Sequence, residues 1–116
     1  MHEDCIFCQI AQRDIPATLV YEDDTVVAFE DINPAAPVHI LVIPRAHIAN
    51  LMEITAANSR VIEHIVATVV PQIVKAKGLE EKGFRLVLNT KEDGGQTVGH
   101  LHFHILGGRA MEWPPG

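Results

Sequence analysis

The sequence predicts an α+β fold: a five-stranded, mainly antiparallel sheet with one long and one short helix. Three β-like segments precede the one long amphipathic segment, and two more follow it. Strands that alternate one by one with helices would instead indicate a parallel sheet. The chain has 116 residues, of which 47% are hydrophobic, so it suits a single packed domain spanning residues 1–116.

The first expected elements are a short helix, a hairpin and a third strand. Residues 5–12 carry apolar side chains at helical spacing, namely Ile6, Phe7 and Ile10. Strands are expected at 18–21 and 25–29, joined by a tight turn of acidic residues, because Asp tolerates turn geometry. The third strand, 38–43, lies between two prolines, which cannot donate to a strand ladder.

Residues 55–76 are expected to form the long helix, because apolar side chains recur there in two adjacent rows at i, i+4 spacing. The rows are Val61, Ile65, Val69 and Ile73, and beside them Ile62, Val66, Val70 and Val74. Thr55 is the expected N-terminal cap, and Gly78 is expected to end the helix in the left-handed conformation. Pro71 is expected to kink the helix or to loosen its last turns.

The last two strands are expected at 84–88 and 100–106, and the second carries three histidines. Alternate side chains of a strand share a face, so the histidines would line one side. They are His100, His102 and His104, while Leu101, Phe103 and Ile105 would pack on the helix. A neutral imidazole is a competent nucleophile, and a protonated neighbour can donate to phosphate oxygens. A partly exposed polar face and a three-histidine metal site remain alternatives.

The loop before the histidines favours phosphate chemistry. Residues 93–99 contain paired glycines, which let backbone N–H groups approach an anion, and Thr97 adds a hydroxyl donor. The net charge is −6 and the chain has no run of Lys or Arg, which argues against a nucleic acid or an anionic membrane as partner. Any phosphate must therefore be bound locally.

The cysteines and the N-terminus bear on the compartment. Cys5 and Cys8 are too close to form a disulfide framework, so a reducing cytoplasm is expected. The start, residues 1–4, is acidic where a secretory signal would be basic, and no apolar run approaches the ~20 residues of a membrane span. A redox pair of the thioredoxin kind would need a βαβ setting. Zinc would need two further ligands.

The chain resembles the histidine triad family. Residues 100–106 fit its signature of three histidines alternating with apolar residues at every position. The likeness extends over nearly the whole chain, through Ile15-Pro16, Tyr21-Glu22-Asp23-Asp24, Phe29, Asp31-Ile32, Pro34, Ala36-Pro37, His39, Val42-Ile43-Pro44, Asn89, Gly94-Gly95-Gln96, Gly107-Gly108-Arg109 and Trp113-Pro114-Pro115-Gly116. The tail and the short length resemble the Hint branch, the purine nucleoside phosphoramidate hydrolases, more than the branch that cleaves dinucleoside polyphosphates.

The resemblance implies roles for particular residues. His102 would be the nucleophile that forms a covalent nucleotidyl-histidine, His39 would orient the His102 ring, and His104 would contact the α-phosphate. The phosphate would also meet Asn89, Gly95, Gln96 and Thr97. Asp31 would bind the ribose hydroxyls, although Asp31 before Asn33-Pro34 can also simply shape a turn. The base pocket would be walled by Ile6, Phe7, Ile10, Phe29, Ile32 and Leu41.

The resemblance also implies assembly and metal content. Family members are homodimers, so sheets would join across two copies, and Trp113 would reach the partner's site. Catalysis would need no cofactor. Some members hold a structural zinc, here through Cys5, Cys8, His47 and His100; the alternative is two reduced thiols. Gly99 departs from the branch, where an aromatic residue is frequent, which leaves the leaving-group preference open.

The expected reaction is hydrolysis of a purine nucleoside 5′-phosphoramidate or an aminoacyl-adenylate, an AMP or GMP derivative, to the nucleoside monophosphate. One alternative is a dinucleoside polyphosphate hydrolase or nucleotidyl transferase that uses the same His102. Another is a nucleotide-binding interaction module with little turnover. The sequence does not separate adenine from guanine, because an apolar pocket with few base-edge contacts discriminates weakly.

Overall fold

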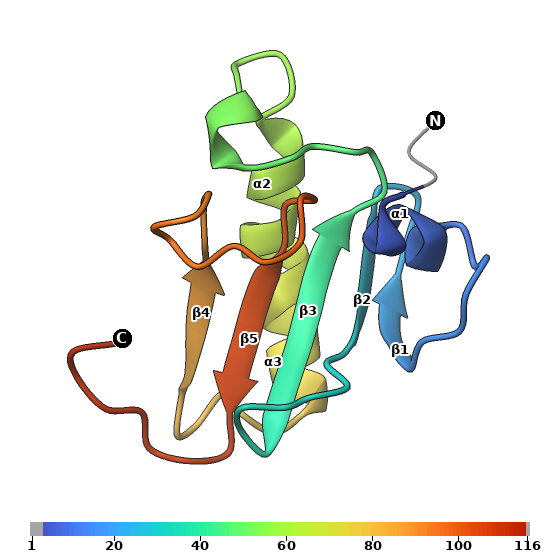
Figure 1. Ribbon diagram of the computed structural model, residues 1–116. Helices are drawn as coiled ribbons and strands as arrows, with labels where there is room; N and C mark the ends of the chain where they lie inside the picture. Colours follow the sequence, from blue (N-terminus) through green and yellow to red (C-terminus); the bar gives the residue numbers. More distant parts are fainter. Residues whose placement is uncertain (1–3, 116) are drawn as a thin grey trace.

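The computed structural model describes residues 4–115. Residues 1–3, which belong to the acidic start, and Gly116 of the tail lie outside the described residues. The elements in chain order are α1 (Ile6–Ala11), β1 (Leu19–Glu22), β2 (Val26–Glu30), β3 (Val38–Pro44), a 3-10 turn η1 (Leu51–Glu53), α2 (Arg60–His64), a π-helical stretch η2 (Ile65–Val69), α3 (Val70–Ala76), β4 (Phe84–Leu88) and β5 (Phe103–Gly107). Together they confirm the predicted α+β class (Figure 1).

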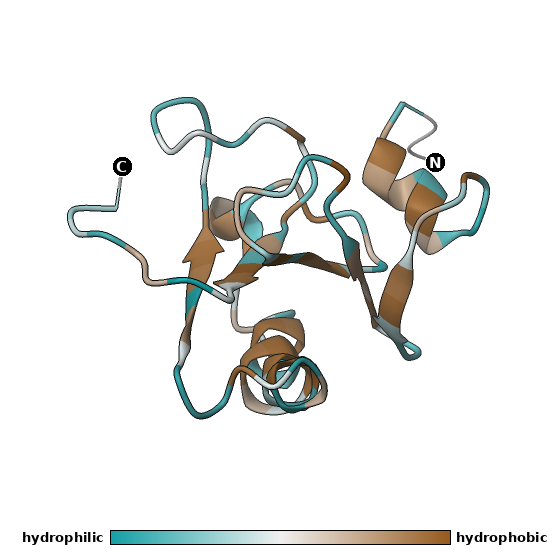
Figure 2. Ribbon diagram, turned by 90° about the horizontal axis from the view of Figure 1, so that it is seen from below, coloured by the Kyte–Doolittle hydropathy of each residue, from teal (hydrophilic) through white to brown (hydrophobic). Residues whose placement is uncertain are grey.

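The strands form one antiparallel sheet in the order β1-β2-β3-β5-β4. The long helix covers one face and α1 packs on the other (Figure 2). Because strand residues alternate between faces, Ile40 and Val42 of β3 enter the helix-side core, while Leu41 and Ile43 pack under α1. The sheet therefore has an apolar helix face and a second face that is left for the histidines.

The long helix begins at Arg60, five residues later than predicted. Thr55 caps a separate turn, in which its Oγ1 accepts from the Ala57 N–H. The expected C-terminus is confirmed: Gly78 has φ +70, and the N–H groups of Gly78 and Leu79 bond the last carbonyls in a Schellman motif.

Of the two effects predicted for Pro71, a kink or looser last turns, the second is not seen, because α3 is regular; the disturbance lies before the proline. Proline lacks an N–H and its ring crowds the carbonyl four residues earlier, and the wide π-helical stretch η2 ends two residues before it. The π turn shifts the apolar rows, so Val66, predicted to lie in the buried stripe, is 47% exposed. No helix of the described residues is long and apolar enough to cross a membrane.

Strand β5 begins at Phe103 and not at His100 as predicted. The ladder between β3 and β5 ends at the pair Val42–Phe103, because Pro44 ends β3 and has no N–H to donate. Residues 100–102 instead run beside the loop that follows β3, and the Leu101 N–H donates to the Ile48 carbonyl at 2.7 Å. Leu101, like Phe103, still points into the helix-side core.

Candidate active site

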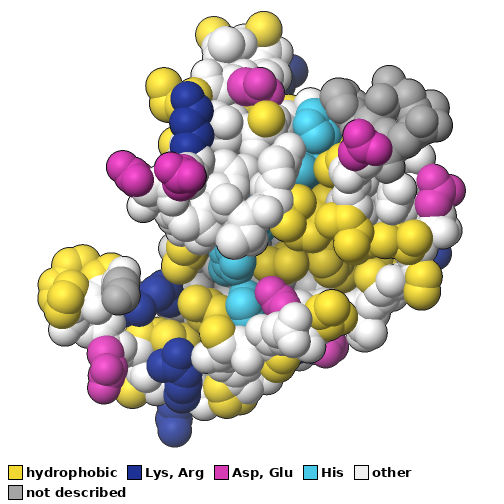
Figure 3. Space-filling model, in the orientation of Figure 1, with side chains coloured by type: hydrophobic (Ala, Val, Ile, Leu, Met, Phe, Trp, Pro, Cys, Tyr) yellow, Lys and Arg dark blue, Asp and Glu magenta, His cyan; other side chains and the backbone are white. Residues whose placement is uncertain are grey.

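A cavity of about 370 Å³ lies between α1 and the free face of the sheet (Figure 3). Ten predicted nucleotide-binding residues line it: Ile6, Phe7, Ile10, Phe29, Asp31, Ile32, Leu41, Thr97, His102 and His104. Ile15, Pro16, Ala17 and Val98 line it without having been assigned to the pocket. The lining contains Glu30 and Asp31 but neither Lys nor Arg. An anion here would therefore have to be bound by histidines, hydroxyls and backbone groups.

His102 is held in one tautomer. Its Nδ1 lies 2.8 Å from the His100 carbonyl, which can only accept, so Nδ1 carries the proton and Nε2 keeps its lone pair. The ring is 4% exposed and contacts Phe7 edge-on, with 5.1 Å between the ring centroids. The structure thus presents an oriented imidazole in the wall of the cavity.

His39 contacts a different histidine from the one predicted. We expected it to orient His102, but its Nε2 lies 2.9 Å from Nδ1 of His104, a diagonal neighbour on β5, where the residue directly opposite His39 is Leu106. The Ala35 N–H donates to His39 Nδ1 at 3.0 Å, so the neutral ring carries its proton on Nε2. His39 therefore donates to His104 Nδ1, and the proton of His104 is fixed on Nε2.

That Nε2 of His104 is the unsatisfied atom of the site. It is buried, and it has no hydrogen-bond partner among the described residues. Burial, with a smaller contribution from the neighbouring His102 and His39 and against the opposing Asp31, lowers the pKa of His104 to about 4. His104 is therefore neutral near pH 7, and an orphaned N–H donor at a cavity wall calls for an acceptor from a ligand.

Asp31 serves the turn and the site at once. Its Oδ1 accepts from the Asn33 N–H at 2.8 Å, as the turn interpretation predicts, while its Oδ2 lies 3.5 Å from His39 Nε2. Burial lowers the pKa of His39, and Asp31 opposes this. The carboxylate also lines the cavity, where its outer oxygen can accept hydroxyl hydrogens.

The glycine loop is built differently from the predicted anion cradle. The N–H groups of Gly95 and Gln96 bond the carbonyls of Glu92 and Lys91 within the loop. The Gln96 amide is also engaged: it accepts from the Lys91 N–H and donates to the carbonyls of Ala49 and Val98. Gln96 therefore shapes the loop, and of this segment Thr97 and Val98 reach the cavity.

Besides Gly95 and Gln96, two more predicted residues are absent from the cavity lining. Asn89 directly follows β4 and is absent from the cavity lining. Trp113 is 83% exposed on the tail beyond β4, where the Arg85 guanidinium donates to the Glu112 carbonyl (Figure 1). Trp113 is not among the lining residues of the cavity under α1.

Behind His102 the structure gathers all four predicted metal ligands, with atoms within 4.8 Å of one another. His100 Nδ1 lies 3.3 Å from Cys5 Sγ and 3.4 Å from Cys8 Sγ, and His47 Nδ1 lies 3.2 Å from Cys8 Sγ. Zn–S bonds of about 2.3 Å and Zn–N bonds of about 2.0 Å in a tetrahedron place sulfur and nitrogen about 3.5 Å apart. The donor set therefore fits a zinc ion.

The surroundings of this cluster fit as well. His100 is fully buried, and its Nε2 lies 2.8 Å from the Pro44 carbonyl, so Nδ1 keeps its lone pair toward the sulfurs. A ligating histidine usually donates its other N–H to such a carbonyl. Without a metal, burial and the contact with Cys5 together raise the pKa of the Cys8 thiol to about 11.

The group Asp31, His39 and His104 is also compact, with atoms within 4.8 Å, but it suits protons better than a metal. The His39 and His104 nitrogens are only 2.9 Å apart, a hydrogen-bond distance. Since the Ala35 N–H already occupies His39 Nδ1, coordination through Nε2 would require a fully deprotonated ring. The two clusters thus differ in kind.

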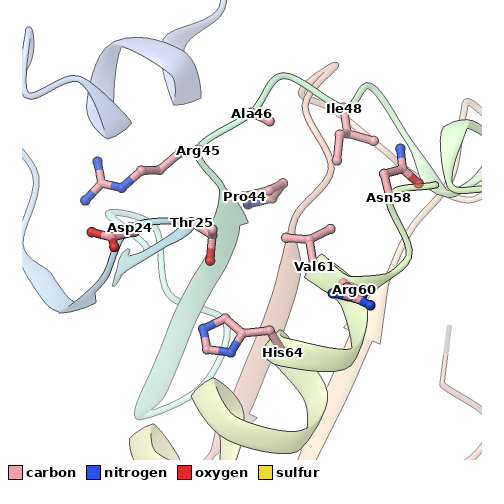
Figure 4. A pocket seen from close by; sticks show the side chains of 10 residues that line it. All are labelled: Asp24, Thr25, Pro44, Arg45, Ala46, Ile48, Asn58, Arg60, Val61 and His64. Carbon is pink, nitrogen blue, oxygen red and sulfur yellow. The ribbon is translucent and has the colours of Figure 1, made fainter.

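A second cavity of about 450 Å³ lies where α2 meets the start of β2 and the end of β3 (Figure 4). His64 points into it from α2. Its Nε2 lies 2.7 Å from Asp23 Oδ2. This is a paired histidine outside the candidate active site.

Comparisons with known proteins agree with the geometry. Residues 12–111 match the HIT domain family. The chain is 43% identical to the purine nucleoside phosphoramidase of Escherichia coli over 111 residues, which are 96% of this chain and 92% of that protein. It is 55% identical to an uncharacterized HIT-like protein of Synechococcus elongatus over the full length of both. The crystal structure of a HIT family hydrolase from Legionella pneumophila superposes with a TM-score of 0.93 at 48% identity, covering 97% of this chain and 99% of that one.

Proposed function

The chain belongs to the HIT family of hydrolases, and on that basis we propose that it hydrolyses purine nucleoside 5′-phosphoramidates or aminoacyl-adenylates to nucleoside monophosphates through a covalent nucleotidyl-His102. The E. coli relative of 43% identity carries the name of this activity. In the proposal the purine occupies the apolar part of the cavity under α1, and the ribose hydroxyls donate to Asp31.

The tautomer of His102 is the observation that carries the proposal. Because the Nδ1–H of His102 donates to the His100 carbonyl, Nε2, which carries the lone pair, is the nucleophilic atom of the ring. In the first step Nε2 forms a bond to phosphorus while the bond to the leaving group breaks. In a phosphoramidate this is the P–N bond, and the leaving amine takes a proton from water; in an aminoacyl-adenylate it is the P–O bond, and the amino acid leaves as a carboxylate. His102 then carries a positive charge, which its hydrogen bond to the carbonyl stabilises.

The second step restores the enzyme. A water oxygen attacks phosphorus, the bond to His102 Nε2 breaks with its electron pair returning to nitrogen, and one water proton passes to solvent. In both steps the buried N–H on His104 Nε2 donates to a phosphoryl oxygen, and Thr97 offers a hydroxyl. Catalysis is then positioning and stabilisation of phosphoryl charge.

The decisive experiment compares substrates and traps the intermediate. Adenosine and guanosine phosphoramidates, aminoacyl-adenylates and diadenosine polyphosphates are assayed with the parent and with His102→Ala. We expect faster turnover of the phosphoramidates, a nucleotidyl adduct on His102 by mass spectrometry, and loss of both in the variant. Faster cleavage of diadenosine polyphosphates would assign the chain to the other branch. Full activity of His102→Ala would refute covalent catalysis.

We also propose a structural zinc held by Cys5, Cys8, His47 and His100, in a chain that works in a reducing, cytoplasmic setting where both thiols stay reduced. The donor set and spacing support it. The ion supplies a cross-link between α1, the loop after β3 and the segment before β5, and the hydrolysis needs no metal. Elemental analysis of protein expressed with zinc tests this: a substoichiometric trace would refute it.

Finally, we propose a homodimer. Val66, Phe84 and Trp113 are exposed apolar side chains, and β4 is an edge strand with free ladder groups. A second copy would cover such surface. Sedimentation velocity at increasing concentration provides the test, and a monomer at every concentration would contradict the proposal.

A further inference from the structure

His100 joins the thiol cluster to the nucleophile. Its ring is held from both sides, with Nε2 2.8 Å from the Pro44 carbonyl and Nδ1 against both sulfurs. Its own carbonyl accepts the Nδ1 proton of His102 at 2.8 Å. Whatever fixes the His100 ring therefore also fixes the acceptor that selects the tautomer of His102.

Helix α1 makes a second connection. Cys5 is its N-cap, with Sγ accepting from the Cys8 N–H at 3.2 Å, and Cys8 lies inside it. Phe7, which lies between the two cysteines, contacts two rings edge-on. Its ring centroid is 5.1 Å from that of His102 and 5.4 Å from that of Phe29. A helix of six residues is not stable alone. Its position over His102 therefore depends on what holds it at both cysteines.

The loop after β3 makes the third connection. It carries His47 and Ile48, whose carbonyl accepts from the Leu101 N–H, and it follows directly on Pro44, the last residue of β3, whose carbonyl contacts the His100 ring. The His47 Nδ1 meets Cys8 at 3.2 Å. The backbone at 100–101, directly before the nucleophile, is thus attached to the loop that supplies the fourth ligand.

We propose that Cys5, Cys8 and His47 are positioning residues for His102. A zinc ion held by them and by His100 fixes α1 and the 100–102 backbone against each other, so that His102 keeps its proton on Nδ1 and Phe7 stays packed on its ring. Thiol hydrogen bonds are weak, so without the ion the same contacts hold His102 loosely. The inference deepens the proposed function and rests on it for the meaning of the nucleophile.

The test uses variants matched at one position. Cys5→Ser keeps a favoured N-cap but loses the thiolate ligand, whereas Cys5→Asp keeps both a cap and an oxygen that zinc accepts. His64→Gln is the control, because His64 lies in neither cluster. Each protein is measured for zinc content, for the His102 tautomer by ¹⁵N NMR, and for kcat and KM, with the fold checked by circular dichroism.

In the zinc-loaded parent we expect one His102 tautomer, with the proton on Nδ1. Chelation under reducing conditions, or Cys5→Ser, should mix the two tautomers and lower kcat about 10- to 100-fold, the range for removing support behind a site. Cys5→Asp with zinc should recover most of both. An unchanged tautomer and kcat after metal loss would overturn the inference.

Two further arms keep the outcome decisive. If the metal-free protein unfolds, cadmium replaces zinc, and its longer bonds to sulfur must shift the His102 resonances while those of His64 stay; unshifted His102 resonances would refute the coupling. A metal-dependent tautomer in a protein that hydrolyses no phosphoramidate would refute the proposed function alone. Hydrolysis with a metal-independent tautomer would refute this inference alone.

Discussion

Within residues 4–115 the protein has two histidine–carboxylate groups of similar composition, and they differ in how completely their hydrogen bonds are made. In Asp23–His64, beside the second cavity, every carboxylate oxygen is satisfied: Oδ2 accepts from Tyr21 and His64, and Oδ1 from Thr25 and Val26. In Asp31–His39–His104 the chain of donors ends on a buried N–H without a partner among the described residues.

The difference teaches how to tell a structural pair from a functional one. Burial alone would raise the pKa of Asp23, but hydrogen bonds from Tyr21, His64 and two backbone amides outweigh it and hold that pKa well below its usual range. The hydrogen bond between Tyr21 and Asp23, together with burial, raises the pKa of Tyr21 to about 12. A saturated group of this kind stabilises the hairpin turn, whereas an unsatisfied donor costs stability until a ligand accepts from it.

The largest effect is expected from removing that donor. His104→Ala should lower kcat/KM about 100- to 1,000-fold, the usual loss for one donor to transition-state charge. His104→Gln, whose amide offers an N–H in a similar place, should lose less. Steady-state kinetics on a nucleoside phosphoramidate measures both. Activity of His104→Ala within threefold of the parent would remove the functional distinction between the two groups.

A smaller effect is expected one step back along the chain. His39→Ala removes the donor to His104 Nδ1 and leaves the Ala35 N–H without its acceptor. A neutral hydrogen bond contributes about 1 kcal/mol, and 1.36 kcal/mol is a factor of ten in rate. We therefore expect kcat to fall about fivefold with little change in KM. A loss confined to KM would indicate that His39 binds substrate directly.

The sequence predicted the sheet, the alternation of faces and the cavity lining, because these follow from periodicity and from the family likeness. It did not predict the partner of His39, since register pairs His39 with the Leu106 position and only side-chain geometry brings its ring to His104. Nor did it predict the role of Gln96, because a loop amide can face a ligand or its own backbone equally well. The π-helical stretch before Pro71 was missed because periodicity assumes a uniform helix.

The acid stability of the two groups should separate along the pH scale. Burial holds the pKa of His104 near 4, below the usual 6.5 of an unfolded histidine, so the native state resists its protonation. That contribution is complete above about pH 6.5 and is lost as pH falls toward 4, whereas the contribution of Asp23 is lost only below about pH 4. Urea unfolding between pH 8 and pH 4 checks this: His104→Gln should flatten the decline, and an identical decline would contradict the assignment.

The smallest effect is expected at the saturated pair. His64→Gln removes one of several hydrogen bonds to Asp23 at a half-exposed position, where an ion pair contributes about 0–1 kcal/mol. Unfolding free energy should fall by no more than that, and kcat/KM should stay within twofold of the parent. Asp23→Asn should lower the unfolding free energy more, because the amide has one accepting oxygen where the carboxylate has two. Since His64 and His104 are both histidines beside a carboxylate, a loss of activity in His64→Gln comparable to that of His104→Gln would mean that completeness of hydrogen bonding does not distinguish the two groups.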